Sequence, residues 1–353
     1  MGLQGADGGR WSLLAPEDLD ELISRQGTAS DRERTEDEPL LAAADPDVTP
    51  VALHDQGAEG ADEQAVIGHR STVPGRSSSD LQVLRRTQEV VEGGQMQITS
   101  RGHRIQYRAA GDRGNPTLLL VHGVLQSANR WVEMGYLDAF ATHYRVVALD
   151  LLGHGDSDKP TDPDQYTVEG HLADLEAVLD AESASTCHVW GYSGGAVVAL
   201  ALAAARPERT LSTIVGGIPP NLPREIREAA FGTWIDALEA GDWPRFWEAF
   251  GPVDPPTRAL LEKDNDPRSV AAWMRGAVAT WELAEPGDVP TLVYMGDKEL
   301  FFDDARQTAQ HLGAEFAVIP GRGHAGAFQD LAAVEPIARA VLEAAPAVTA
   351  TET

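Results

Sequence analysis

Short apolar runs alternate with helix-like segments from about residue 96 to about residue 345. The apolar runs have the length of strands, and most of them are separated by segments with helical periodicity. Strands are predicted at 96–100, 104–109, 117–121, 145–150, 187–192, 211–216, 291–295 and 315–319. Helices are predicted near 128–142, 168–182, 194–206, 304–312 and 329–344. This alternation calls for crossover connections, so it predicts an α/β fold with a mostly parallel sheet of eight strands flanked by helices.

Two parts of this region depart from the alternation. The strands at 96–100 and 104–109 have no helix between them, and they predict an antiparallel hairpin at one edge of the sheet. Within 218–288 the pattern changes to several short helical segments that carry five tryptophans: Trp234, Trp243, Trp247, Trp273 and Trp281. We interpret this interval as a small helical cap inserted over the sheet.

Residues 1–95 have a different composition, with 19 acidic residues, 8 basic residues and few aromatic ones. Such a segment buries too little apolar area to offset the entropy lost on ordering, so it predicts a disordered N-terminal extension. One short helix is expected near 17–26, where Leu19, Leu22 and Ile23 share a face. The extension is a candidate for contact with another protein. Residues 346–353 are expected to form a C-terminal tail.

The composition narrows the classes of partner and compartment. The formal net charge is −27, which repels nucleic acid and anionic membrane surfaces, so neither is expected as a partner. The single cysteine, Cys187, cannot form an intramolecular disulfide, which favours a reducing compartment. The first residues lack the basic and apolar regions of a signal peptide, and no apolar stretch is long enough to span a bilayer. We therefore expect a cytoplasmic protein.

The strongest chemical signal is the segment Gly191-Tyr192-Ser193-Gly194-Gly195, which matches G-x-S-x-G directly after a predicted strand and directly before a predicted helix. Glycines beside the serine lack the Cβ atoms that would clash in a sharp turn, so Ser193 can adopt a strained conformation with an exposed hydroxyl. The backbone N–H of Gly194 then lies at a helix N-terminus, where it can stabilise an oxyanion. The alternative is a small residue in a tight turn.

A nucleophilic serine needs a base, and the base needs an orienting carboxylate. His324 is the candidate base, because it follows the last predicted parallel strand and a glycine-rich loop and precedes the last helix. His122, His154 and His171 are the competing histidines, but none of them follows that strand.

At this point the chain resembles the α/β hydrolase superfamily, in which nucleophile, acid and histidine occur in that order along the chain. The resemblance covers about residues 96–345 and rests on the segments LLLVHGVLQSANRW, VVALDLLGHGDSDKP, GYSGG, TLVYMGDKELF and IPGRGHA. It implies a sheet of the α/β hydrolase type with a helical cap. In similar enzymes the loop DLLGHGDSDKP is usually structural and borders the pocket.

The resemblance also implies roles for individual residues. The amide of Val124 would complete an oxyanion hole with that of Gly194. Similar enzymes usually show G-x-x-D after the strand that follows the cap, and Gly296-Asp297-Lys298-Glu299 matches it with glutamate at the acid position. Glu299 is the first choice for the acid, and Asp297 is the fallback. The candidates for lining the pocket are His122, Tyr192 and Trp131.

The function implied by the resemblance is that of a metal-free, cofactor-free serine hydrolase acting on a small-molecule carboxylic ester, thioester or lactone through an acyl-enzyme. Dehalogenases and epoxide hydrolases of this fold use an aspartate nucleophile, so Ser193 argues against both. The same triad would also serve a carbon–carbon bond hydrolase, a cofactor-free perhydrolase, or a biosynthetic acyl transferase or cyclase. A non-catalytic receptor that binds a ligand under the cap is the remaining alternative.

Overall fold

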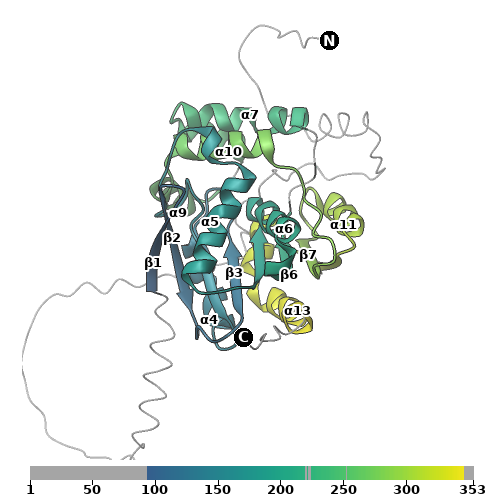
Figure 1. Ribbon diagram of the computed structural model, residues 1–353. Helices are drawn as coiled ribbons and strands as arrows, with labels where there is room; N and C mark the ends of the chain where they lie inside the picture. Colours follow the sequence, from purple (N-terminus) through teal and green to yellow (C-terminus); the bar gives the residue numbers. More distant parts are fainter. Residues whose placement is uncertain (1–93, 219–220, 222–223, 252, 346–353) are drawn as a thin grey trace, which may run out of the picture.

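A computed structural model describes residues 94–218, 221, 224–251 and 253–345 (Figure 1). The predicted extension lies outside these residues up to position 93, as do its short helix near 17–26 and the predicted tail at 346–353. Gly94 and Gln95, placed in the extension by sequence, belong to the first strand.

The centre of the molecule is one sheet of eight strands in the order β1-β2-β4-β3-β5-β6-β7-β8. The strands are β1 (Gly94–Ser100), β2 (His103–Ala110), β3 (Thr117–Val121), β4 (Arg145–Leu149), β5 (Cys187–Tyr192), β6 (Thr210–Gly216), β7 (Thr291–Gly296) and β8 (Glu315–Ile319). β2 pairs antiparallel with β1 and β4, and all the other pairs are parallel. The predicted edge hairpin and the mostly parallel sheet are therefore confirmed.

Helices cover both faces of the sheet (Figure 1). They are α3 (Ala128–Glu133), α4 (Tyr136–Phe140), α5 (Val168–Ala181), α6 (Gly194–Ala205), α11 (Phe302–His311), α12 (His324–Gln329) and α13 (Leu331–Ala344), with short 3₁₀ turns η1 (Pro163–Gln165) and η2 (Pro207–Arg209). Leu119 and Val121 of β3 join the core that contains α5, α6 and α11, whereas Leu118 and Leu120 join the core that contains α3, α4, α12 and α13. This alternation follows from the two-residue period of a strand, which sends successive side chains to opposite faces.

One of the predicted helices is two helices, and another is preceded by a helix that was not predicted. The segment predicted at 128–142 is interrupted by Gly135, whose φ of 80° lies in the left-handed region and ends α3 before α4 begins. The segment predicted at 329–344 is α13, and the short α12 that precedes it was not predicted. The Asp330 carboxylate accepts a hydrogen bond from the N–H of Ala333 and so caps a new helix, α13.

α6, which follows directly after Ser193, is a deeply buried helix. Nine of its residues, from Gly195 to Ala203, are buried, and they are all glycine, alanine, valine or leucine. Small side chains let the helix lie close to β3, β5 and β6, and an apolar surface all around a helix is typical of one enclosed by protein. The sequence of α6 therefore fixes the end of β5, from which the helix starts.

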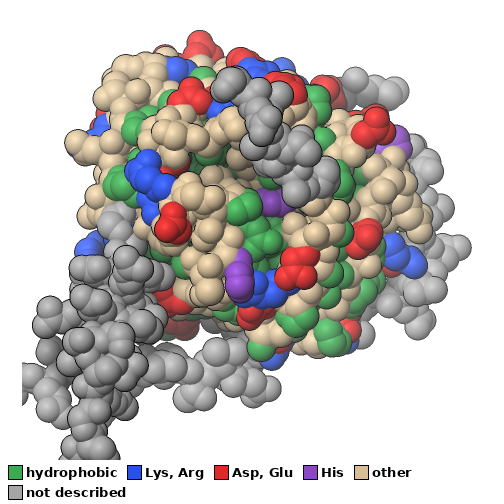
Figure 2. Space-filling view, turned by 60° about the horizontal axis from the view of Figure 1, so that its bottom comes forward, with side chains coloured by type: hydrophobic (Ala, Val, Ile, Leu, Met, Phe, Trp, Pro, Cys, Tyr) green, Lys and Arg blue, Asp and Glu red, His purple; other side chains and the backbone are tan. Residues whose placement is uncertain are grey.

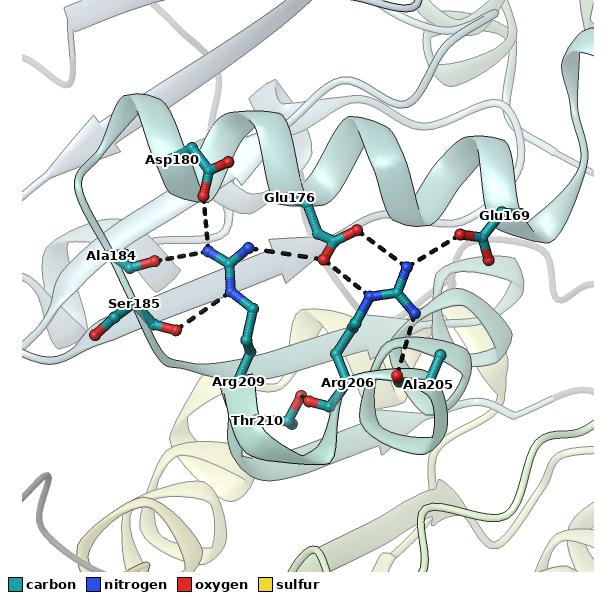
Figure 3. Close-up of polar contacts among 9 residues, drawn as sticks. All are labelled: Glu169, Glu176, Asp180, Ala184, Ser185, Ala205, Arg206, Arg209 and Thr210. Carbon is teal, nitrogen blue, oxygen red and sulfur yellow. Dashed lines mark hydrogen bonds and ion pairs between the residues drawn. The ribbon is translucent and has the colours of Figure 1, made fainter.

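Arginines after α6 tie this helix to α5 (Figure 3). Arg206 donates to the carboxylates of Glu176 and Glu169, and Arg209 pairs with Asp180 and donates to the backbone oxygens of residues 184 and 185. Each ion pair at a partly exposed surface contributes only about 0.2–1 kcal/mol. The main effect of this network is to align the end of α6 with the helix beside it.

Four helices occupy the interval predicted as a cap: α7 (Arg224–Glu239), α8 (Trp243–Phe250), α9 (Pro255–Asp264) and α10 (Pro267–Thr280). The last three start in the same way, with an aspartate N-cap whose carboxylate accepts from the N–H of the third helical residue and a proline in the first turn. α7 and α10 pack against each other above the sheet (Figure 1). In the part of the chain that the structure describes, no helix is both long and apolar enough to cross a membrane.

Buried histidines predict a pH-dependent stability. Burial lowers the pKa of His122 and His188 to about 4 and that of His171 to about 3, from an ordinary value of 6.5. As the pH falls below about 6.5, the unfolded chain binds protons that the folded chain does not, so folding loses stability. The free energy of unfolding should fall between pH 6.5 and pH 5 by up to about 1.4 kcal/mol per pH unit and per histidine.

Urea unfolding at pH 7, 6 and 5 measures this slope. The variant His188→Gln keeps a group that can contact the Ser212 hydroxyl, which lies 2.8 Å from His188 Nδ1, and it should reduce the slope by the share of one histidine. A free energy of unfolding that does not change from pH 7 to pH 5 would contradict the account of the buried histidines.

Candidate active site

Ser193 lies in the turn between β5 and α6 with φ 55° and ψ −124°, a strained conformation for a residue with a side chain. Glycine is required on both sides of it. A Cβ atom at Gly191 would lie 2.2 Å from the backbone oxygen of Gly195, and one at Gly195 would lie 2.3 Å from the backbone oxygen of Val121. The Ser193 N–H donates to the backbone oxygen of Gly216 at 2.9 Å, which ties the turn to β6.

The loop after β3 lies directly against the serine. A Cβ atom at Gly123 would lie 2.9 Å from the Ser193 Cβ and 3.4 Å from its Oγ, so this loop requires glycine for the approach. A Cβ atom at Gly194 would lie 3.7 Å from the backbone nitrogen of Val124. The structure therefore brings together the Val124 and Gly194 backbones, the two predicted sources of oxyanion-hole amides, beside Ser193.

His122 holds this loop in place. Its Nδ1 lies 2.7 Å from the backbone oxygen of Gly123, and its Nε2 accepts from the N–H of Leu151 at 3.0 Å. The acceptor role of Nε2 puts the proton on Nδ1, so the imidazole is neutral and donates to the Gly123 oxygen. Complete burial lowers the pKa of His122 to about 4, which keeps it in this form near neutral pH.

No role was predicted for Leu125, which follows Val124 in this loop, or for its partner Asn265. Leu125 has φ 63°, in the left-handed region, and its backbone oxygen accepts from the Asn265 side chain at 2.8 Å. Asn265 also donates to the backbone oxygen of Leu261 in α9. One amide thus joins the loop after β3 to the cap across 140 positions of sequence, and no local motif marks such a long-range contact.

His324 and Glu299 form a direct pair. His324 Nδ1 lies 2.8 Å from Glu299 Oε2, and the Glu299 side chain is only 4% exposed. A second Glu299 oxygen accepts from the N–H of Gly296 at 3.2 Å. Tyr192 donates from its hydroxyl to the backbone oxygen of His324, and Gly217 leaves room for the imidazole, since a Cβ there would lie 2.7 Å from Cε1.

Asp297, the fallback acid, has another partner. Its carboxylate accepts from the N–H of Gly321 at 2.7 Å and so holds the loop after β8. Of the two carboxylates in the sequence motif, the structure brings Glu299 to His324 and places Asp297 on the backbone of the loop that leads to it.

A cavity of about 140 Å³ lies between the turn at Ser193 and the cap. Ser193, His324 and Tyr192 line it together with residues 123–127 of the loop after β3. Its other wall comes from the cap through Phe250, Val253, Thr257, Leu260, Leu261 and Asp264, and the polar residues Asn129, Arg130, Glu133 and Gln329 also line it. Figure 2 shows a face on which hydrophobic side chains gather near the centre beside a histidine, bordered by acidic and basic groups.

Two of the three residues predicted to line the pocket do not line this cavity. His122 is completely buried behind the loop and uses both ring nitrogens on the backbone. Trp131 is also completely buried and packs edge-on against Tyr136, Trp190 and Phe328 on the other face of the sheet. Both predictions are wrong for the same reason, because a residue next to a site in sequence can point into the core. Among the described residues, no cluster of three or more potential ligands could hold a metal ion.

Comparisons with known proteins agree with this architecture. A family model described as the alpha/beta hydrolase fold matches residues 116–239, from just before β3 to the end of the first cap helix. The chain has the α/β hydrolase fold. The crystal structure of a bacterial membrane phospholipase A matches this chain with a TM-score of 0.58 and 21% identity, over 74% of this chain and 90% of that one.

Other relatives carry different names. The enol-lactonase of Burkholderia xenovorans LB400 matches with a TM-score of 0.54 and 21% identity, over 70% of this chain and 98% of that one. Epoxide hydrolase 4 of Mus musculus is 37% identical over 124 residues, which are 35% of this chain and 34% of that protein. The chain thus spans about a third of the length of the first curated relatives it matches.

The glycines on either side of Ser193 provide a test of the geometry of this turn, which we call the elbow. Gly195→Ala should destabilise the protein by about 2 kcal/mol or more, because the new methyl group meets backbone oxygens that cannot move aside. Gly232→Ala in α7 is the matched control, since nothing lies within 4 Å of a Cβ there, and it should stabilise the protein by about 0.5–1 kcal/mol. Urea unfolding gives both values. Equal stability of the two variants would show that the elbow is not constrained as described.

Proposed function

We propose that this hydrolase is a serine hydrolase that cleaves a carboxylic ester, thioester or lactone through an acyl-enzyme. The observation that carries the proposal is the strained Ser193 at the start of α6, in one cavity with a histidine that is paired to a buried glutamate. Strain of this kind costs about 1–3 kcal/mol and persists mainly where function requires it. A small residue that only filled a turn would not require it.

His324 acts as the base in this proposal. An ionised Glu299 accepts from Nδ1–H, which leaves the lone pair of Nε2 to accept a proton. As Ser193 Oγ forms a bond to the substrate carbonyl carbon, its proton moves to Nε2. The imidazolium then returns that proton to the leaving alcohol, thiol or ring oxygen as the tetrahedral intermediate collapses to the acyl-enzyme. Water attacks the acyl-enzyme by the same route and releases the acid.

The oxyanion of each tetrahedral intermediate is stabilised by backbone N–H groups. The amides of Val124 and Gly194 belong to the two backbone segments that approach each other beside Ser193. The N-terminus of α6 adds its partial positive charge at the same point. Removing one such donor commonly costs about 3 kcal/mol of transition-state stabilisation in hydrolases.

The nucleophile favours acyl transfer over epoxide opening. Several curated relatives are named epoxide hydrolases. The family resemblance described above implies that epoxide hydrolases of this fold carry an aspartate nucleophile. This chain has Ser193 there, and an alkyl–serine ether formed from an epoxide would have no carbonyl for water to attack. An ester formed on serine has that carbonyl, so water can hydrolyse it and the enzyme is regenerated.

The cavity favours a substrate with an apolar part. Leu125, Phe250 and Leu261 contribute apolar walls. The charged residues Arg130, Glu133 and Asp264 also line the cavity. Burial of each methylene group against such walls contributes about 0.8 kcal/mol. An acyl or alcohol chain of several carbons should therefore be preferred over acetyl esters of short alcohols.

The first test replaces the nucleophile. Ser193→Ala should abolish turnover of an activated aryl ester and labelling by a fluorophosphonate probe, because the variant lacks the hydroxyl that carries the acyl group in this proposal. Ser127→Ala is the matched control, since Ser127 lines the same cavity, and it should still react with the probe. Residual hydrolysis by Ser193→Ala within about tenfold of the parent rate would refute the proposed nucleophile.

The second test separates the two acidic residues. Glu299→Gln removes the charge that pairs with His324 and should lower turnover by roughly 100-fold or more. Asp297→Asn keeps a side-chain oxygen for the N–H of Gly321 and should lower it by no more than about threefold. Steady-state kinetics on one ester compare the two variants. The reverse ranking would assign the role of the acid to Asp297.

A further inference from the structure

The loop after β3 contains a strained residue of its own, Leu125, in addition to the strained Ser193 of the elbow. The N–H of Gln126 donates to the backbone oxygen of Gly123 at 3.2 Å, so residues 123–126 form a tight turn. Leu125 is the third residue of this turn and has φ 63°. A positive φ at the third position is the type II pattern, which favours glycine or asparagine there. Leucine in this conformation is strained.

The strain at Leu125 bears on Val124, the residue before it. Without a restraint, leucine favours the type I turn, in which the peptide group between Val124 and Leu125 is rotated by about half a turn. Val124 supplies one of the two proposed oxyanion-hole amides, and its backbone nitrogen lies close to Gly194. The side chain of Leu125 is only 3% exposed, and its packing accounts for a leucine here but does not by itself favour a positive φ. Another contact must hold the backbone.

Asn265 supplies such a contact. Its side-chain Nδ2 donates to the backbone oxygen of Leu125 and to that of Leu261, each at 2.8 Å. Both neighbours are carbonyl oxygens, which only accept, so the donor end of the amide must face them. Asn265 is 6% exposed, so water does not compete freely for these bonds. A hydrogen bond of this kind is comparable in size to the strain of a left-handed leucine and can therefore hold the turn.

Asn265 lies at the end of the cap helix that covers the cavity. It is the C-cap residue of α9, and none of the residues of α9 is buried. One side of this helix lines the cavity at Ser193 through four of its residues: Thr257, Leu260, Leu261 and Asp264. The side-chain amide of Asn265 therefore attaches a lightly packed wall of the cavity to the turn that carries Val124.

We infer that Asn265 is a positioning residue for acyl transfer. It holds Leu125 in the left-handed region and so keeps the N–H of Val124 directed at the oxyanion. Without this bond the turn shifts toward the type I form, and the oxyanion loses part of its stabilisation. The inference rests on the proposed serine hydrolase function and adds to it a residue of the cap that does not line the cavity.

Asn265→Leu tests this role, because leucine is similar in size and cannot donate a hydrogen bond. With 4-nitrophenyl butanoate as substrate, kcat should fall by about tenfold or more, since one oxyanion donor is misplaced in both acylation and deacylation. KM should stay within about threefold of the parent value, because a contact that acts only in the transition state changes kcat and kcat/KM equally. Thermal unfolding shows whether the variant is folded. Asn265→Ala removes the same donor and replaces Asn265→Leu if that variant does not fold.

Glu262→Ala is the matched control. Glu262 accepts from Nε1 of Trp247 at 2.5 Å, so it fastens α9 to α8 rather than to the loop after β3. Loosening α9 alone changes one wall of the cavity, so this variant should raise KM and leave kcat within about twofold of the parent value. If Asn265→Leu gave this same pattern, a raised KM with an unchanged kcat, Asn265 would only fasten α9 and the positioning role would be wrong.

Relief of the strain at Leu125 gives a second readout. Glycine adopts a positive φ without a steric cost. Leu125→Gly added to Asn265→Leu should therefore raise kcat by about threefold or more over Asn265→Leu alone. A contact that only fastened the cap would not be replaced by a change at Leu125. A double variant with the kcat of the single variant would thus contradict the role of Asn265.

Labelling by a fluorophosphonate separates this inference from the proposed function. If Ser193 of the parent is labelled and Asn265→Leu keeps the parent kcat, Asn265 does not position the oxyanion hole, while the serine hydrolase stands. If the parent is neither labelled nor active on the ester, the role of Asn265 is overturned together with the proposed function.

Discussion

The arrangement of the candidate site depends on one strained turn, the passage from β5 to α6 at Ser193. Its positive φ persists because the surroundings leave no alternative: Gly191 and Gly195 are in contact with backbone, and the N–H of Ser193 is bonded to β6. The buried helix that follows holds the turn from the other side. Burial of α6 against three strands offsets a local cost of about 1–3 kcal/mol.

The other parts of the site are each attached to this turn by a specific contact. His122 fixes the loop after β3 against the serine, and Asn265 joins that loop to the cap. Tyr192, the residue before the serine, donates to the backbone of His324 and so links the elbow to the proposed base. These contacts connect the turn at Ser193, the loop after β3, His324 and the cap into one arrangement. The chemistry proposed above depends on that connection.

Much of this was predictable from local patterns. The eight strands follow from apolar runs bounded by turn residues, and the elbow follows from glycine spacing around Ser193. The sequence narrowed the acid that pairs with His324 only to Glu299 or Asp297. The conformation of the short loop after β7 decides which of these carboxylates reaches the histidine. Sequence could not show that Trp131 faces the far core, since that direction depends on how α3 packs. Nor could it show the contact of Asn265 with Leu125, which lies 140 positions away.

The central claim is that Ser193 carries the acyl group during turnover. The direct measurement mixes the protein with an aryl ester, quenches with acid within the first turnover, digests the protein and determines the mass of the peptide that contains Ser193. The account predicts that this peptide gains the mass of the acyl group and that the modified residue is Ser193. Turnover with an unmodified Ser193, or with the substrate attached to a carboxylate side chain, would contradict it.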